Sequence, residues 1–82
     1  MIIDLRTQSE RQRRPRRADV QIEVPVPMTH EVKGWLSRML LNIAEGNPRQ
    51  RFEVFCGSGA RSSFAAQVLR GAGRHVEDWG AA

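Results

Sequence analysis

Residues 52–63 read FEVFCGSGARSS, a β-prone run, a glycine-containing turn and the start of a helix in direct succession. The aromatic and branched side chains of residues 52–56 favour a short strand that ends at Cys56. After the turn, apolar residues recur at helical spacing until the glycines at 71 and 73, namely Phe64, Ala65, Val68, Leu69 and Ala72. A strand followed at once by a helix is the unit from which parallel α/β sheets are built.

The flanking sequence supplies further elements of the same kind. Residues 2–5 form a short apolar run, and residues 20–26 alternate apolar and polar side chains up to two prolines that confine this strand to an edge or end it. A helix is predicted from an N-cap at Thr29 to a stop at Gly46, and a last strand over residues 75–79. The fold expected is α/β, with a mostly parallel twisted sheet and helices packed against it.

Length and composition favour one soluble domain over residues 1–82. The chain is 40% hydrophobic and 27% charged, and no apolar run approaches the roughly 20 residues of a membrane span. The start of the chain has an acid within its apolar run and no basic region before it, so no secretory signal is indicated and a cytoplasmic location is expected. The single cysteine cannot form an intramolecular disulfide.

The net charge of +4 is concentrated in one run. Residues 11–17 read RQRRPRR, which leaves eight of the 13 basic side chains against nine acidic ones elsewhere. We expect this run to be a flexible, solvated loop between the first two strands. Because no aromatic residue interleaves the arginines, a nucleic-acid partner is not the favoured interpretation.

Cys56 and the turn after it form the candidate reactive site. The carboxyl end of a strand is where α/β sheets bind ligands, and the turn glycines allow backbone N–H groups to converge on an anion. The same N–H groups, the start of the next helix and Arg61 would lower the pKa of the Cys56 thiol. The alternatives are a buried hydrophobic cysteine, an ordinary strand-to-helix turn and an arginine that is merely solvated.

At these residues the sequence resembles the rhodanese family, whose active-site loop is Cys-x-[Ser/Ala]-Gly-x-Arg-Ser and is matched at every position from Cys56 to Ser62. Weaker likenesses are an early Asp-x-Arg segment at Asp4–Arg6, a strand leading to Pro25, and a closing region from Gly71 to Gly80. The family's Gly-His-Ile element and its outer elements at both ends are absent, so the resemblance is to a small rhodanese-like fold that is truncated at both ends.

This resemblance implies a sulfurtransferase of the thiosulfate type, since the rhodanese-like phosphatases carry a loop that is one residue longer. Cys56 would take sulfur from a small anion such as thiosulfate, hold it as a persulfide, and pass it to cyanide, a thiol or a protein acceptor. The substrate-binding loop would be Gly57, Ser58, Gly59, Ala60 and Arg61, and Arg61 would also act with Cys56 in catalysis by orienting or neutralising the anion. The second hypothesis is a non-catalytic module of the same fold whose residues 11–17 bind an acidic protein or RNA.

Other residues carry weaker expectations. His30 and His75 have no Cys or Asp at ligand spacing, so we expect neither a metal nor a cofactor. Asp4 either contacts the reactive site or receives Arg6 and backbone N–H groups. Trp79 is a candidate contact or lid residue near the site.

Overall fold

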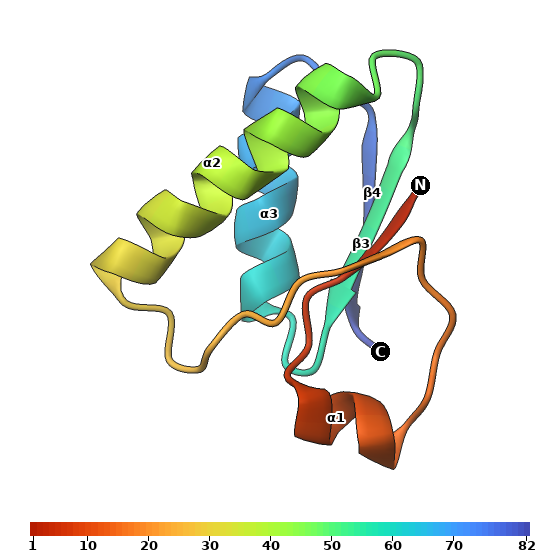
Figure 1. The fold of residues 1–82 in the computed structure, drawn as a ribbon, viewed down its shortest axis with the longest axis vertical. Helices are drawn as coiled ribbons and strands as arrows, with labels where there is room; N and C mark the ends of the chain where they lie inside the picture. The colour runs from red at the N-terminus through yellow and green to blue at the C-terminus, as the bar shows by residue number, and fades with distance from the viewer.

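A four-stranded sheet with the order β2-β1-β3-β4 forms the centre of the computed structural model, which describes all of residues 1–82. Every neighbouring pair of strands is parallel. In chain order the elements are β1 Ile2–Asp4, α1 Gln8–Arg13, β2 Val20–Gln21, α2 His30–Gly46, β3 Phe52–Cys56, α3 Ala60–Gly71 and β4 Val76–Ala81 (Figure 1). The expected α/β class and parallel sheet are confirmed.

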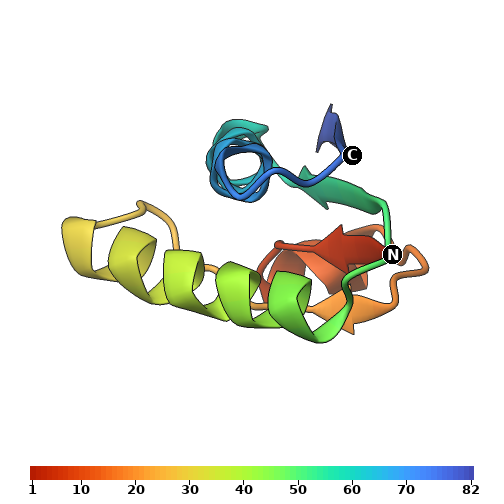
Figure 2. The same ribbon diagram turned by 90° about the horizontal axis from the view of Figure 1, so that it is seen from above.

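The hydrophobic core lies between one face of the sheet and the two long helices. Figure 2 shows α2 and α3 on the same side of the strands. Strand residues that point to that side interdigitate with the apolar stripes of both helices, the central members being Ile3, Leu5, Val54, Leu36, Leu40, Ala65 and Leu69. This packing fixes β3 and α3 relative to each other, and so fixes the turn that joins them.

The second strand is shorter than expected. Val20 and Gln21 pair with β1, whereas Ile22 and Val24 continue as buried extended chain outside the sheet. One further backbone bond, from Ile22 N to Asp4 O, follows the strand before the chain reaches Pro25. Proline has no N–H to donate to a neighbouring strand, so the ladder cannot continue through it.

The last strand is displaced towards the C-terminus relative to the predicted residues 75–79. It covers Val76–Ala81 and contains an irregularity in its pairing with β3, where Val54 is opposite Asp78 and Phe55 is opposite Gly80. The extra residue at this bulge is Trp79, which stacks on the Phe55 ring with centroids 5.5 Å apart.

The segment expected to be a flexible loop, residues 11–17, overlaps the end of α1. Its N-cap is Thr7, whose side chain accepts from the Glu10 backbone while the Glu10 carboxylate accepts from the Thr7 N–H, a complete capping box. The helix lies beyond the carboxyl ends of the strands (Figure 1). Two arginines of the run, Arg11 and Arg13, therefore belong to a helix, and the expectation of a flexible, solvated loop is wrong for them.

None of the three helices is both long and apolar enough to cross a lipid bilayer.

Candidate active site at the Cys56 loop

Cys56 is the last residue of β3, an inner strand of the sheet, and its side chain has no exposed surface. The chain then turns through residues 57–59 into α3. Gly59 is the N-cap of α3 and has φ +92°, a conformation that L-residues with a side chain rarely adopt. This glycine lets the turn curl back over the cysteine.

The Cys56 sulfur lies in a cradle of hydrogen-bond donors. The backbone N–H of Gly59 donates to Sγ at 3.0 Å, and the backbone N–H of Ser62 donates to it at 3.3 Å. Sγ also contacts the Ser62 hydroxyl oxygen at 3.5 Å, with the thiol as donor, and this hydroxyl in turn donates to the Gly59 carbonyl. Ser62 is fully buried, so this hydroxyl belongs to the site and not to the surface.

These contacts favour the thiolate. Burial raises the pKa of Cys56, but the hydrogen bond with the Ser62 side chain and those from the backbone of residues 58, 59 and 62 outweigh it. The net result is a pKa below the ordinary value of a cysteine thiol. A buried, purely hydrophobic cysteine would show the opposite shift.

Arg61 lies beside the loop but is already engaged. Its Nη1 and Nη2 donate to the two carboxylate oxygens of Glu10 at 2.8 and 2.9 Å, a bidentate pair. Nη1 also lies 3.3 Å from the Leu5 carbonyl and 3.4 Å from the Val24 carbonyl. The side chain is 2% exposed. Arg61 therefore joins β1, the extended segment before α2, and α1 to the start of α3.

The pKa values follow from this pairing. The hydrogen bond from Arg61 lowers the pKa of Glu10 to about 2, although burial opposes it. The same pair raises the pKa of Arg61. Because the Glu10 carboxylate neutralises the guanidinium, little of the Arg61 charge is left to attract an external anion.

Glu10 also covers the loop itself. A Cβ added at Gly57 would overlap the Oε2 atom of Glu10, so a larger residue fits there only if this carboxylate or the loop shifts. Gly57, Ser58 and Ala60 are exposed on their outer side, whereas Cys56 is not. An external molecule therefore reaches Sγ only when the loop, or the α1 residue above it, moves.

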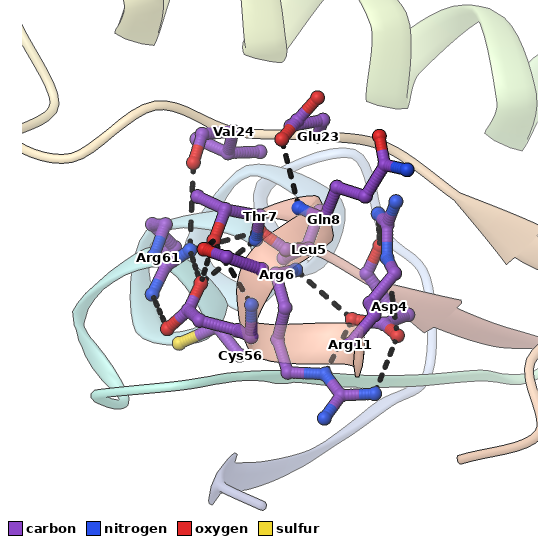
Figure 3. A network of polar contacts seen from close by, with 12 residues as sticks. Asp4, Leu5, Arg6, Thr7, Gln8, Arg11, Glu23, Val24, Cys56 and Arg61 are labelled. Atoms are coloured by element: carbon purple, nitrogen blue, oxygen red, sulfur yellow. Dashed lines mark hydrogen bonds and ion pairs between the residues drawn. The ribbon is translucent and has the colours of Figure 1, made fainter. Parts of the chain in front are cut away.

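A second polar network anchors α1. The Asp4 carboxylate is buried and accepts from Nε and Nη2 of Arg6 at 3.0 and 2.9 Å, and from the Arg6 backbone N–H. Arg11 completes the group with an Nε–Oδ2 distance of 3.4 Å (Figure 3). Of the two roles considered for Asp4, the structure shows the one in which it receives Arg6.

The buried Arg6 side chain continues this network to the end of α1. Its Nη1 donates to the Arg14 carbonyl at 2.7 Å, which fixes the point where the chain leaves the helix. A cavity of about 230 Å³ lies beside Gly57, between this helix end and the last residues of β4.

The structure brings together Cys56, Gly57, Ser58, Gly59, Ala60 and Arg61 as one loop and helix start, as the sequence predicts. The roles of Ser62 and Glu10 were not predicted from the sequence. Ser62 was visible as the last position of the loop motif, and Glu10 as the third residue after Thr7 in a capping-box pattern. Trp79 lies on the sheet face away from α2 and α3, where Arg16 is 5.8 Å above its ring, and not over the sulfur.

The histidines lie at the start of α2 and just before β4, and no group of three or more His, Cys, Asp or Glu side chains is placed to hold a metal ion. No protein-family model matches the chain, and no curated protein or solved structure is significantly similar to it.

Proposed function

We propose that the protein is a rhodanese-type sulfurtransferase or sulfur carrier that acts through a persulfide on Cys56. The observation that carries the proposal is the pair of backbone N–H groups, from Gly59 and Ser62, that donate to Sγ. They stabilise negative charge on sulfur at the carboxyl edge of a parallel sheet. The resemblance of residues 56–62 to the rhodanese loop supports the same chemistry.

The reaction consists of two balanced transfers. The Cys56 thiolate attacks the outer sulfur of thiosulfate, the S–S bond of the donor breaks, and sulfite leaves with its electron pair. The persulfide carries one negative charge, as the thiolate did. In the second step a thiolate or cyanide attacks the outer sulfur, the persulfide bond breaks, and the Cys56 thiolate is regenerated. Neither step needs a metal, an oxidant or a cofactor.

The loop amides serve both steps. As thiosulfate approaches, they hold the nucleophile as a thiolate. After the transfer, the negative charge lies on the outer sulfur of the persulfide, and the glycines let the loop widen to admit it. The chemistry requires a reduced Cys56, so the proposal includes a cytoplasmic, reducing location.

The test is mass spectrometry of the intact protein after incubation with thiosulfate. Wild type should gain one sulfur atom that a reductant removes, and Cys56→Ser should gain none while keeping its circular dichroism spectrum. Cyanide should then release the sulfur as thiocyanate from the wild-type adduct alone. If folded wild type remains unmodified in excess thiosulfate at neutral pH, the proposal fails.

A second candidate is a non-catalytic module that binds an acidic protein or RNA through residues 11–17. The observations that favour it are the full burial of Cys56 and the exposure of Arg13, Arg14 and Arg17 without ion pairs. A tight, salt-sensitive complex with RNA or an acidic protein, formed by a chain that takes no sulfur from thiosulfate, would establish it instead.

A further inference from the structure

We infer that the cavity beside Gly57 binds the carboxylate end of a small organic thiol, and that this thiol is the sulfur acceptor. The inference rests on the proposed sulfur transfer and specifies the substrate of its second step. It starts from the cavity's position, because Gly57 directly follows Cys56 and forms part of the cavity wall.

The charges around the cavity favour an anion. Arg13 and Arg14 line it, and neither takes part in an ion pair with an acid of this chain. The two other charged groups in the wall are compensated, since Arg6 is paired with Asp4 and Glu10 with Arg61. The side-chain charge left over is therefore that of two guanidinium groups, which bind carboxylates in a bidentate geometry.

Buried hydrogen bonds fix the backbone that forms one wall of the cavity. Arg6 is 1% exposed, is locked on the Asp4 carboxylate, and donates to the Arg14 carbonyl at 2.7 Å. The backbone N–H of Arg14 donates to the Glu10 carbonyl, which closes the last turn of α1. Because both the N–H and the C=O of Arg14 are bonded, the arginines start from a fixed backbone position, and little backbone ordering is needed on binding.

The shape and apolar part of the wall favour an organic ligand over a bare inorganic anion. The opposite wall is formed by Ala81 and Ala82, and the volume of about 230 Å³ exceeds that of several water molecules at roughly 30 Å³ each. A short carbon chain packs against the alanine methyl groups while its carboxylate meets the arginines. The thiol at the other end of the chain then points towards the loop that holds the persulfide.

The experiment compares two acceptors of similar size on the persulfide form of the protein. The protein is loaded with thiosulfate, freed of excess donor, and mixed with 3-mercaptopropionate or with the uncharged 2-mercaptoethanol at equal thiolate concentration. Mass spectrometry follows the loss of the added sulfur. Wild type should transfer sulfur about tenfold faster to 3-mercaptopropionate, the size of effect expected from charge-assisted hydrogen bonds.

The key variant is Arg13→Gln/Arg14→Gln, and its matched control is Arg38→Gln/Arg49→Gln, which removes the same charge from exposed sites away from the cavity. The first should lose the preference for the carboxylate and still accept sulfur from thiosulfate at a near-normal rate. The control should keep the preference. An unchanged preference in the first variant, or an equal loss in both, would overturn the inference, as would a defect confined to loading from thiosulfate.

A binding measurement separates this inference from the proposed function. In Cys56→Ser, which performs no transfer, 3-mercaptopropionate should shift the backbone amide resonances of Gly57, Ala81 and Ala82, and Arg13→Gln/Arg14→Gln in the same background should abolish the shifts. Shifts without any persulfide in wild type would support the cavity and refute the transferase. A persulfide without shifts would support the transferase and refute the cavity.

Discussion

Ser62 is the residue whose hydroxyl lowers the pKa of the Cys56 thiol. It is buried, it contacts Sγ at 3.5 Å, and its contact lowers the pKa of Cys56 against the effect of burial. In Ser62→Ala the pKa of Cys56 should rise, so the fraction of thiolate at pH 7 should fall several-fold. The ultraviolet absorbance of the thiolate, measured against pH, should show the midpoint moving upward. Ser63→Ala, at the exposed next position of α3, should leave the midpoint in place.

The Glu10–Arg61 pair stabilises the fold in a pH-dependent way. The pKa of Glu10 is about 2 in the folded chain against 4.5 for a free carboxyl, so its contribution is fully present above pH 4.5 and is lost as the pH falls towards 2. Glu10→Gln leaves the buried guanidinium without its counter-charge and should cost on the order of 3 kcal/mol at pH 7. Urea unfolding should show that the two proteins converge in stability on acidification. A constant difference across that range would contradict the pairing.

Arg61→Ala distinguishes a residue that binds anions from one that ties elements together. Because its guanidinium contacts Glu10 and the carbonyls of Leu5 and Val24, stability and persulfide formation should fall together. We expect a loss of about 3–5 kcal/mol in urea unfolding, the usual cost of breaking a buried ion pair. A variant that remains as stable as wild type but takes up thiosulfate sulfur slowly would instead restore the anion-binding role.

At the scale of elements, α1 lies against the Cys56 loop through the close approach of the Glu10 carboxylate to Gly57. Gly57→Ala would force its methyl group into the Glu10 carboxylate, so the loop and α1 must separate or the ion pair must shift. The free energy of unfolding should fall by about 1–3 kcal/mol. Gly71→Ala, at the end of α3 where nothing lies within 4 Å, is the control and should be neutral or slightly stabilising. Equal effects would show that the loop is not pressed against α1.

The elements that could be predicted from the sequence are those with a long apolar pattern or a clear strand composition. The helix from the N-cap Thr29 to Gly46 and the strand over residues 52–56 are confirmed. They were predictable because the helix has both a regular apolar spacing and a cap, and the strand has a β-prone composition. The six-residue α1 has no buried residue, so no apolar period reveals it, and only its capping box was visible. The last strand was displaced by a bulge, which leaves no mark in the alternation of side chains.

The candidate site was predictable only in its local part. The loop from Cys56 to Arg61 is continuous in sequence, and backbone geometry alone places its amides on the sulfur. The partner of Arg61 is Glu10, 51 positions away in the chain, so no spacing rule connects them. The cavity beside Gly57 is likewise assembled from three separate segments, and depends on a fold that must form first.

At the scale of the whole molecule, the sheet is covered by long helices on one face only. The other face carries Phe55 and Trp79, stacked with an interplanar angle of 16°, and Arg16 lies 5.7 Å above the first ring and 5.8 Å above the second. The Arg6 guanidinium approaches Phe55 from 5.0 Å. Cation–π contacts and the Asp4 network therefore take the place of a second helical layer.

These contacts divide four arginines of residues 11–17 into two pairs, one that stabilises the fold and one that does not. Replacing the two pairs separately tests this division. Arg11 pairs with the buried Asp4 and Arg16 covers the aromatic stack, whereas Arg13 and Arg17 are exposed and take part in no ion pair. Arg11→Gln/Arg16→Gln should therefore lower the free energy of unfolding by about 1–2 kcal/mol, because it leaves Asp4 with one partner fewer and uncovers the rings. Arg13→Gln/Arg17→Gln removes the same charge and should change the free energy of unfolding by less than about 0.5 kcal/mol.

Urea unfolding at low and moderate salt is the measurement that separates the two pairs. Salt screens the repulsion between exposed arginines, whereas it has little effect on the aromatic and buried contacts. If both variants lose stability equally, or both gain it through reduced net charge, the run acts as a uniform solvated segment and the second face of the sheet is stabilised by other groups.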